Sequence, residues 1–287
     1  MNFLNTACRK ENANPAGLLY YLDTIQGEDK DGYGTLELTT KEKFYQLESY
    51  RVSSTMGKEL ISDLNFLHGI DINQMALDSL ENEAIVGNQR LLLSKYISLG
   101  EITRDKDLKK SKWNRFLFRF ISESHFSFHF DSPDDLIKKI LAKSNHIGVR
   151  SRRGNGDFII CPLKYSTYIM ESPRFAYRTT GEISESPENV DFIGTIEDRI
   201  QVFVDRNASF TEDRILIGRR TSESDPGVYF VIGDKSTEEF MDTDGNKKIT
   251  LIYRQAIFNT KGCEGLFDII RVNDSKRPFW KKLFCVK

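Results

Sequence analysis

The sequence predicts an α+β fold, and three patterns in it support that class. In the first half of the chain, apolar residues recur at helical spacing, most clearly over residues 71–98. Beyond Gly194 the apolar residues instead form short runs rich in β-branched and aromatic side chains, as in strands. Two alternating runs within residues 33–58 predict a two-stranded hairpin. We therefore expect helices early in the chain and a strand-rich second half.

The composition is that of a folded protein with almost no net charge. Of the 287 residues, 39% are hydrophobic and 29% are charged, which is too apolar for a disordered chain. The 41 basic and 42 acidic residues leave a net charge of -1, so no overall positive field attracts nucleic acid or an anionic membrane. No stretch approaches the ~18 apolar residues of a membrane span, and no signal-peptide core opens the chain.

Cysteine usage fits a reducing, cytosol-like compartment. Cys8, Cys161, Cys263 and Cys285 are scattered along the chain without CxxC spacing. This pattern supports neither a zinc site nor a disulfide framework.

Residues 1–32 are predicted to form an arm. Asn14-Pro15-Ala16-Gly17 and Asp31-Gly32 interrupt any periodicity, which leaves room for at most one short helix around residues 18–22. We expect such an arm to become ordered against a neighbouring molecule.

The predicted hairpin of residues 33–58 has a charged tip. Leu36 and Leu38 alternate with polar residues on its first strand, and a second alternation covers residues 44–48. The connecting residues 39–43 include the charged residues Lys41, Glu42 and Lys43. Because an isolated hairpin is marginal in water, we expect this one to lie against another surface.

Two consecutive helices follow the hairpin. Apolar residues at helical spacing over 60–67 are followed by Gly69, a suitable left-handed end for the first helix. Asp71 is placed to cap the second, with Gln74 completing a capping box, and apolar residues continue towards Gly100. The second helix is predicted to be a rod on the order of 40 Å long. Gly87 in its middle indicates a close neighbour or a bend.

The rest of the chain alternates between strand and helix signals. Residues 126–130 alternate with the period of a strand, and Ser132-Pro133-Asp134-Asp135 opens a helix predicted to stop near Gly148. A strand over 158–161 leads into a helix that begins at Pro162. Further strands are predicted over 200–204, 215–217, 228–232, 249–258 and 266–272.

Three candidate ligand sites have simpler structural interpretations. His125 and His129 have the spacing of two metal ligands on a helix, with Asp131 nearby, but the alternation around them predicts a strand. Asp242-Thr243-Asp244-Gly245-Asn246 opens like a calcium loop, yet its glycine is in the wrong position, so a hairpin turn is favoured. Gly154-Asn155-Gly156 precedes a strand, whereas phosphate-binding loops follow one.

No catalytic centre can be nominated. The sequence contains no GxSxG, HExxH or GK[ST] motif, and its 4 histidines suggest no nucleophile and base pair. We therefore expect a protein that is not an enzyme and that needs no cofactor or metal.

Two basic stretches have more than one interpretation. Residues 106–119 combine Lys and Arg with Trp113, Phe116 and Phe118, and a second cluster covers 150–153. Together they could bind phosphates and stack on bases, as in a nucleic-acid-binding regulator. They could equally be a solvated face, or the electropositive half of a contact between subunits. The candidate contact patch comprises Lys109, Lys110, Arg150, Arg152 and Arg153.

Two ordered sets of motifs carry a family resemblance. The first runs from Glu59-Leu60-Ile61-Ser62-Asp63-Leu64 through Leu67-His68-Gly69-Ile70-Asp71 into the long helix with Glu83, Asn88 and Arg90. The second consists of Arg153-Gly154-Asn155-Gly156-Asp157-Phe158-Ile159-Ile160, Phe192-Ile193-Gly194, Arg199 to Asp205, and Glu223 to Phe230. In this order, over roughly half of the chain, they resemble the major head proteins of T-even-like myoviruses.

The resemblance implies the Hong Kong 97-type capsid fold. The expected parts are an N-terminal arm (1–32), an extended two-stranded loop (33–58), a peripheral domain (59–130) with a spine helix at about 71–98, a mixed α/β axial domain (131–260), and a C-terminal strand and tail (261–287) that return to the peripheral domain.

The same resemblance implies a structural role in a virus particle. The chain would be a coat protein that self-assembles through hexamers or pentamers into the icosahedral or prolate head shell of a tailed phage. Its projecting loop would lie across neighbouring subunits, so reversing the charges of the assembly residues Lys41, Glu42 and Lys43 should impair assembly more than folding. It would assemble in the host bacterial cytoplasm with scaffold, portal and head-accessory proteins, and enclose DNA without reading its sequence. The alternative within the same fold is an encapsulin-like compartment shell.

The chain departs from the family pattern at three points. It is shorter than typical members, which leaves little room for a removable N-terminal segment. Val231-Ile232 stands where the family continues with Pro-Tyr, and the basic, aromatic tail from Lys276 to Lys287 has no counterpart in the pattern. These departures leave open whether the chain builds hexamers, pentamers or both.

Overall fold

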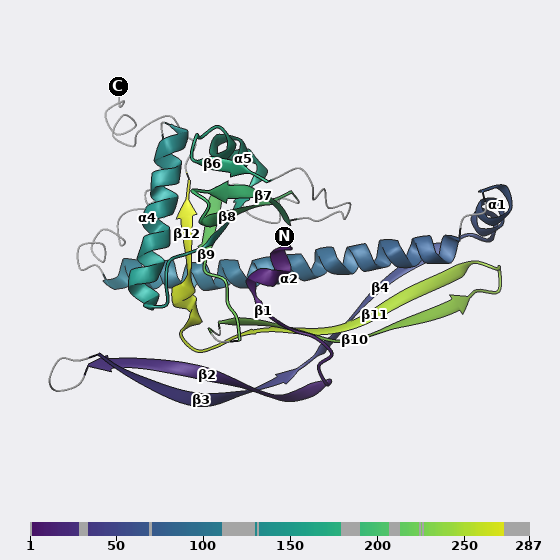
Figure 1. Ribbon diagram of the computed structural model, residues 1–287. Coiled ribbons are helices and arrows are strands. Elements are labelled where there is room, and N and C mark those ends of the chain that lie inside the picture. The colour runs from purple at the N-terminus through teal and green to yellow at the C-terminus, as the bar shows by residue number, and fades with distance from the viewer. Residues whose placement is uncertain are drawn as a thin grey trace, which may run out of the picture.

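The computed structural model describes residues 2–28, 34–68, 71–110, 130, 132–178, 190–206, 213–223, 225 and 227–272. The molecule is elongated, and one long helix, α2, runs through most of its length (Figure 1). In chain order the elements are η1 (Phe3–Thr6), β1 (Cys8–Lys10), β2 (Ala16–Glu28), β3 (Gly34–Gln46), β4 (Glu48–Met56), α1 (Lys58–His68), α2 (Ile72–Lys110), α4 (Pro133–Ser151), β5 (Phe158–Pro162), α5 (Leu163–Met170), β6 (Phe175–Tyr177), β7 (Val190–Ile196), β8 (Ile200–Asp205), β9 (Arg214–Gly218), β10 (Val228–Met241), β11 (Lys247–Asn259), η3 (Cys263–Leu266) and β12 (Phe267–Arg271).

A six-stranded sheet of order β12-β9-β5-β8-β7-β6 lies across the C-terminal half of α2. Because side chains alternate between the two faces of a strand, neighbouring residues of β5 enter different cores. Phe158 and Ile160 pack with Leu92, Leu93 and Tyr96 of α2 on one face. The other face is covered by α4 and α5, whose apolar side chains pack on Ile159 and Cys161 of the same strand.

A narrow four-stranded sheet of order β1-β10-β11-β4 runs beside the N-terminal half of α2. Ile249 and Leu251 of β11 pack against Ile72, Ala76 and Leu80 of the helix, which follow its 3.6-residue period. β10 and β11 are joined by the predicted tight turn, in which Gly245 has a φ of 79°. The motif at residues 242–246 is therefore a hairpin turn, because only a residue without Cβ enters this conformation readily.

The axial domain predicted over residues 131–260 needs one correction. β10 and β11 lie in the narrow sheet beside α2 rather than in the six-stranded sheet of the predicted axial domain. β12 is an edge strand of that six-stranded sheet, where it pairs with β9 from Phe267↔Gly218 to Arg271↔Arg214. β12 also packs on α2, the helix of the predicted peripheral domain, where Ile269 approaches Gly100, so the predicted return of the C-terminal segment to that domain stays a prediction. β10 and β11 have clear local strand signals, but pairing between distant segments decides which sheet they join.

The second predicted helix is longer than expected. α2 contains 39 residues, which corresponds to about 58 Å at 1.5 Å per residue. Asp71 caps it as predicted, since its Oδ1 accepts hydrogen bonds from the backbone of Asn73 and Gln74 at 2.9 and 3.3 Å. The capping box is wrong, because the Gln74 side chain donates to Asp78 at 2.7 Å instead.

Gly100 does not end α2 but allows it to approach the six-stranded sheet. A Cβ at this position would lie 2.8 Å from Cγ1 of Ile269 on β12, whereas one at Gly87 would lie 3.3 Å from the Tyr253 hydroxyl.

Gly100→Ala is therefore expected to destabilise the protein by about 1–3 kcal/mol through overpacking. Gly87→Ala should be neutral or stabilising by up to about 1 kcal/mol, because Ala is the better helix former. Urea unfolding of both variants measures the difference, and equal midpoints would contradict it.

The helix predicted from residue 132 begins as expected and ends later. The Ser132 side chain accepts a hydrogen bond from the backbone N–H of Asp135 at 3.2 Å, with Pro133 at the first helical position. Gly148 lies inside α4, and the helix ends when Arg152 adopts a left-handed conformation with a φ of 55°. The Gly154-Asn155-Gly156 segment then connects α4 to β5.

Within the described ranges, no helix is both long and apolar enough to cross a membrane. The same residues contain no group of three or more His, Cys, Asp or Glu side chains that could hold a metal ion. His125, His129 and Asp131, together with Trp113, Phe116 and Phe118, lie outside the described residues.

Candidate assembly surfaces

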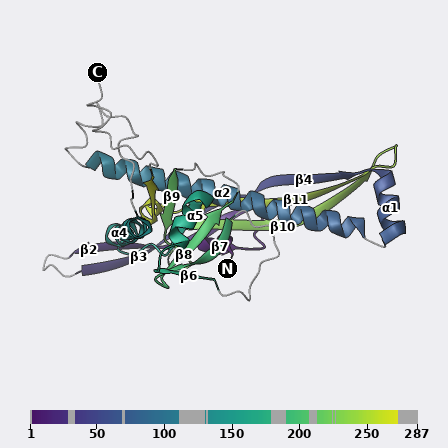
Figure 2. The same cartoon turned by 90° about the horizontal axis from the view of Figure 1, so that it is seen from above.

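The extended hairpin is built from different residues than predicted. β2 pairs with β3 from Ala16↔Gln46 to Glu28↔Gly34, so the second half of the expected arm is the first strand of the hairpin. β4, expected within the hairpin, is instead the edge strand of the narrow sheet. The predicted 33–58 hairpin is therefore wrong, because Pro15 and Gly17 mark the start of a strand rather than its absence. In Figures 1 and 2 the β2–β3 hairpin points in the opposite direction from the β10–β11 turn.

One face of the β2–β3 hairpin is anchored to the narrow sheet. Leu19 and Tyr45 are buried, and the Tyr45 ring stacks on Phe258 with centroids 6.3 Å apart. Phe258 in turn stacks on Tyr229 at 5.5 Å. This aromatic cluster fixes the direction in which the hairpin leaves the molecule.

The opposite face of the hairpin carries large apolar side chains in solvent. Leu18, Tyr20 and Phe44 are 50%, 64% and 63% exposed, respectively. Leu18 is the register partner of Phe44, and Tyr20 that of Glu42, so all four share one face. We call Leu18, Tyr20, Glu42 and Phe44 the outer face of the hairpin. A cluster of exposed apolar residues of this kind is typical of a protein interaction surface.

The candidate residues Lys41, Glu42 and Lys43 lie within β3 and not at a tip. They are the register partners of Tyr21, Tyr20 and Leu19, respectively. The alternation of β2 places only Glu42 on the outer face, while Lys41 and Lys43 share the face of buried Leu19. Their predicted role in assembly stays a prediction, although the predicted tip position is wrong.

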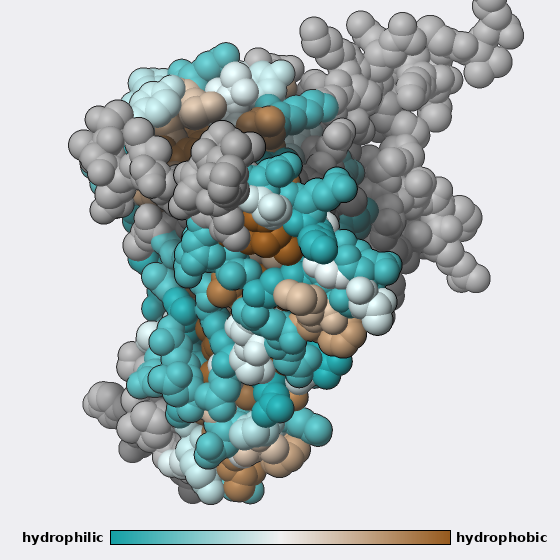
Figure 3. Space-filling view, turned by 90° about the vertical axis from the view of Figure 1, so that its right-hand side faces the viewer, coloured by the Kyte–Doolittle hydropathy of each residue, from teal (hydrophilic) through white to brown (hydrophobic). Residues whose placement is uncertain are grey.

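Large apolar residues are also exposed at the other end of the molecule. They are Leu60 of α1, Met75 of α2, and Phe240 and Met241 at the end of β10. Figure 3 looks at the molecule from this side, and there hydrophobic residues interrupt a mainly hydrophilic surface. Both ends of the elongated subunit therefore expose apolar side chains.

The three candidate residues of the long helix lie in different environments. Glu83 and Arg90 are exposed and, seven residues apart, lie on one side of α2. Asn88 is half-buried, and its Oδ1 atom is buried without a hydrogen-bond partner. The structure thus places Asn88 towards the interior and the two charged residues at the surface.

The candidate basic patch is largely involved in internal contacts. Arg150 donates hydrogen bonds to the carbonyls of Gly265 and Phe267 at 3.1 and 3.0 Å, and Arg153 lies 3.4 Å from a carboxylate oxygen of Asp225. Arg152 is exposed at the end of α4. Lys109 and Lys110 belong to the last turn of α2, a different element. The structure therefore does not present Arg150 and Arg153 as a phosphate-binding surface.

The buried cysteines are poor nucleophiles. Burial raises the pKa of the Cys8 and Cys263 thiols to about 11 and that of Cys161 to about 12. The reactive form of cysteine is the thiolate, so at neutral pH these side chains remain protonated and inert.

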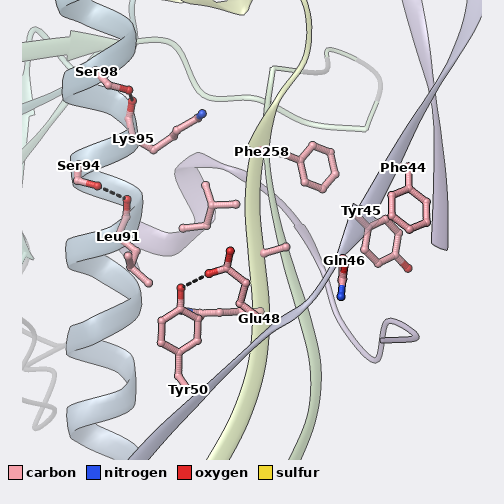
Figure 4. A pocket seen from close by; sticks show the side chains of 13 residues that line it. Phe44, Tyr45, Gln46, Glu48, Tyr50, Leu91, Ser94, Lys95, Ser98 and Phe258 are labelled. Atoms are coloured by element: carbon pink, nitrogen blue, oxygen red, sulfur yellow. Dashed lines mark hydrogen bonds between the residues drawn. The ribbon is translucent and has the colours of Figure 1, made fainter. Parts of the chain in front are cut away.

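A cavity of about 480 Å³ opens between α2, β11 and the base of the hairpin (Figure 4). Leu91, Ser94, Lys95 and Ser98 line it from the helix, and Phe44, Tyr45 and Gln46 from β3. Glu48, Tyr50 and residues 255–258 of β11 complete the lining. The Tyr50 hydroxyl donates to Glu48 at 2.8 Å, and the Lys95 side chain points into the opening. Sequence reasoning missed this site because its residues come from three distant segments.

Comparison with known proteins identifies relatives of this chain. The family model described as "Major capsid protein Gp23" matches residues 14–276. The major capsid protein of Vibrio phage KVP40 is 22% identical over 222 residues, which cover 72% of this chain and 42% of that relative. The chain thus spans about two fifths of the length of that curated relative.

Solved structures show the same fold at low sequence identity. The capsid of Cyanophage P-SCSP1u has a TM-score of 0.54 at 6% identity, covering 96% of this chain and 88% of that one. The virus-like particle from Pyrococcus furiosus has a TM-score of 0.52 at 11% identity, covering 94% and 92%, respectively. The predicted α+β, Hong Kong 97-type fold is confirmed.

Proposed function

Since this chain belongs to the major capsid protein Gp23 family, we propose that it is the coat subunit of a tailed-phage head. It self-assembles into the shell that encloses the DNA, and it performs no catalysis. The observation that supports this role best is the hairpin, whose outer face exposes Leu18, Tyr20 and Phe44. A free subunit gains nothing from a projecting apolar face, whereas a neighbouring subunit can bury it.

Repetition of one contact explains how such a subunit builds a shell. The projecting hairpin and the surface that receives it are different parts of the chain, so their contact is heterologous and can close a ring. Burying an exposed large apolar side chain contributes about 1.5–3 kcal/mol. Many such contacts, each modest, therefore sum to a stable particle.

The setting of this assembly follows from the same role. The subunit assembles in the host bacterial cytoplasm and ends in the virion. Scaffold, portal and head-accessory proteins are its expected partners, and its DNA contacts do not depend on sequence. A net charge of -1 suits a container wall, since a strongly cationic wall would hold the packaged DNA tightly.

The nucleic-acid-binding alternative has less support. Its proposed patch relies on Arg150 and Arg153, which are occupied by the Gly265 and Phe267 carbonyls and by Asp225. An encapsulin-like shell has the same fold, and the match to a phage capsid family favours the head shell over it.

Negative-stain microscopy of the purified protein, combined with sedimentation velocity, tests the proposal. We expect shells, tubes or rings whose abundance rises with protein concentration. A sample that stays monomeric at high concentration, alone and with the other head proteins of its phage, would overturn it.

A further inference from the structure

The cavity between α2, β11 and the hairpin contains an unpaired edge of β11. The register of β11 with β4 ends at Gln255↔Glu48, whereas its register with β10 continues to Asn259. Among the described residues, Ala256, Ile257 and Phe258 therefore have a strand partner on one side only. An unpaired strand edge offers backbone donors and acceptors that another extended segment can use.

Two polar side chains at this edge indicate that it binds an added peptide segment. Gln255 is 2% exposed, yet neither its amide nitrogen nor its amide oxygen has a hydrogen-bond partner. Buried polar groups are normally hydrogen-bonded. The Gln255 amide has an unused donor and an unused acceptor, and a peptide group supplies a partner for each. Lys95 lines the same cavity, and no ion pair between described residues includes it, which favours a carboxylate on the incoming segment.

The outer half of β10 has an unpaired strand edge and an exposed carboxylate, which match the unpaired edge of β11 and the amine of Lys95. β1 pairs with β10 only from Tyr229 to Val231, so residues 236–241 pair with β11 alone and are exposed along their whole length. Thr237 and Glu239 are opposite Leu251 and Ile249, the residues that pack on α2. Glu238 and Phe240 therefore share the opposite face, two residues and about 6.7 Å apart.

We propose that residues 236–241 of β10 from a second copy of this chain add as a strand to residues 256–258 of β11. Glu238 then pairs with Lys95, and Phe240, on the same face of the added strand, packs on Tyr50 and Ile257, the cavity-lining residues on the α2 side of the sheet. Backbone groups of the added strand satisfy the Gln255 amide. The chain already contains a pairing of this length, since β1 adds to β10 through three residue pairs. This inference rests on the proposed shell function and specifies one of its contacts.

Peptide binding to the full-length subunit tests the contact directly. The probe is a fluorescent peptide of residues 235–243, followed by anisotropy below the concentration at which particles form. Lys95→Glu is expected to weaken binding at least about tenfold, and a Glu238→Lys peptide should restore binding to that variant. Lys261→Glu, at an exposed lysine that does not line the cavity, is the matched control and should bind normally. Equal binding to wild type and Lys95→Glu, or no binding to either, would overturn the proposal.

Gln255→Leu tests whether the Gln255 amide serves peptide binding or the stability of the fold. Removing an unpaired buried amide should leave the free subunit as stable as wild type or more stable, while peptide binding weakens. A less stable variant with normal peptide binding would show that the amide serves the fold and would overturn its assigned role. In assembly assays, Lys95→Glu and Glu238→Lys should each reduce particle yield, and their combination in one chain should recover it.

The outcomes also distinguish this contact from the shell function. Normal particles from Lys95→Glu subunits would overturn the contact and leave the coat role standing. Specific peptide binding by a protein that never forms particles would support the contact and count against the coat role.

Discussion

Subunits carrying Leu18→Ser and Tyr20→Ser are expected to fold normally and to form no shells. Both side chains lie on the outer face of the hairpin and are 50% and 64% exposed, so their loss removes little from the free subunit. In a shell that buries them, each contributes about 1.5–3 kcal/mol per contact. Losing both contacts should therefore raise the protein concentration needed for assembly more than a hundredfold, because about 1.4 kcal/mol changes an equilibrium constant tenfold.

Leu19→Ser is the matched control, because Leu19 is next in sequence but buried on the anchored face. Truncating a buried leucine costs about 2–5 kcal/mol, so this variant should unfold at lower denaturant. Circular dichroism with urea and sedimentation velocity separate the two effects. Normal particles from the Leu18→Ser/Tyr20→Ser protein would refute the role of the outer face.

The charge reversal of Lys41, Glu42 and Lys43 gives a finer test of the same strand. Since only Glu42 lies on the outer face, Glu42→Lys should reproduce most of the assembly defect of the triple reversal. Single reversals of Lys41 or Lys43 should have smaller effects on particle yield.

Asp268→Ala is expected to cause the largest loss of folding stability among single charge deletions. The Asp268 carboxylate is completely buried between α4 and β12. It accepts hydrogen bonds from the Lys143 amine at 3.1 and 3.0 Å, and Arg150 lies 3.6 Å away. Its removal leaves two partly buried cations without their common partner. Breaking a buried ion pair in this way costs about 3 kcal/mol, at the lower end of the range because both cations reach solvent.

Urea unfolding monitored by circular dichroism measures the effect. In a chain of this size, about 3 kcal/mol lowers the melting temperature by roughly 6–12 °C. Asp134→Ala is the control, since its 2.7 Å ion pair with Lys138 is at the surface and should contribute little. An unchanged unfolding midpoint for Asp268→Ala would contradict the structural role of this carboxylate.

The candidate site was only partly accessible from sequence. The long helix and its exposed residues Glu83 and Arg90 could be predicted, because they depend on a local pattern. The strands of the hairpin could not, because β2 and β3 pair only in the folded chain. The cavity could not, because Lys95, Gln255 and Phe44 show no local signal and meet only through the packing of α2, β11 and β3. The unpaired edge of β11 could not be predicted either. It arises because β11 pairs with β10 over more residues than with β4, and no local sequence pattern shows where either pairing ends.

The sequence by itself determined the fold class, the family and the starts of the long helices. Ser132 and Asp71 act on backbone groups two or three residues away, so their capping roles are readable without a structure. The tertiary structure alone decided that β2 joins β3, that β12 joins the six-stranded sheet, and that α2 continues past Gly100. These outcomes depend on residues far apart in the chain: Gly100 is needed because Ile269 approaches it, and no neighbour in sequence reveals that contact.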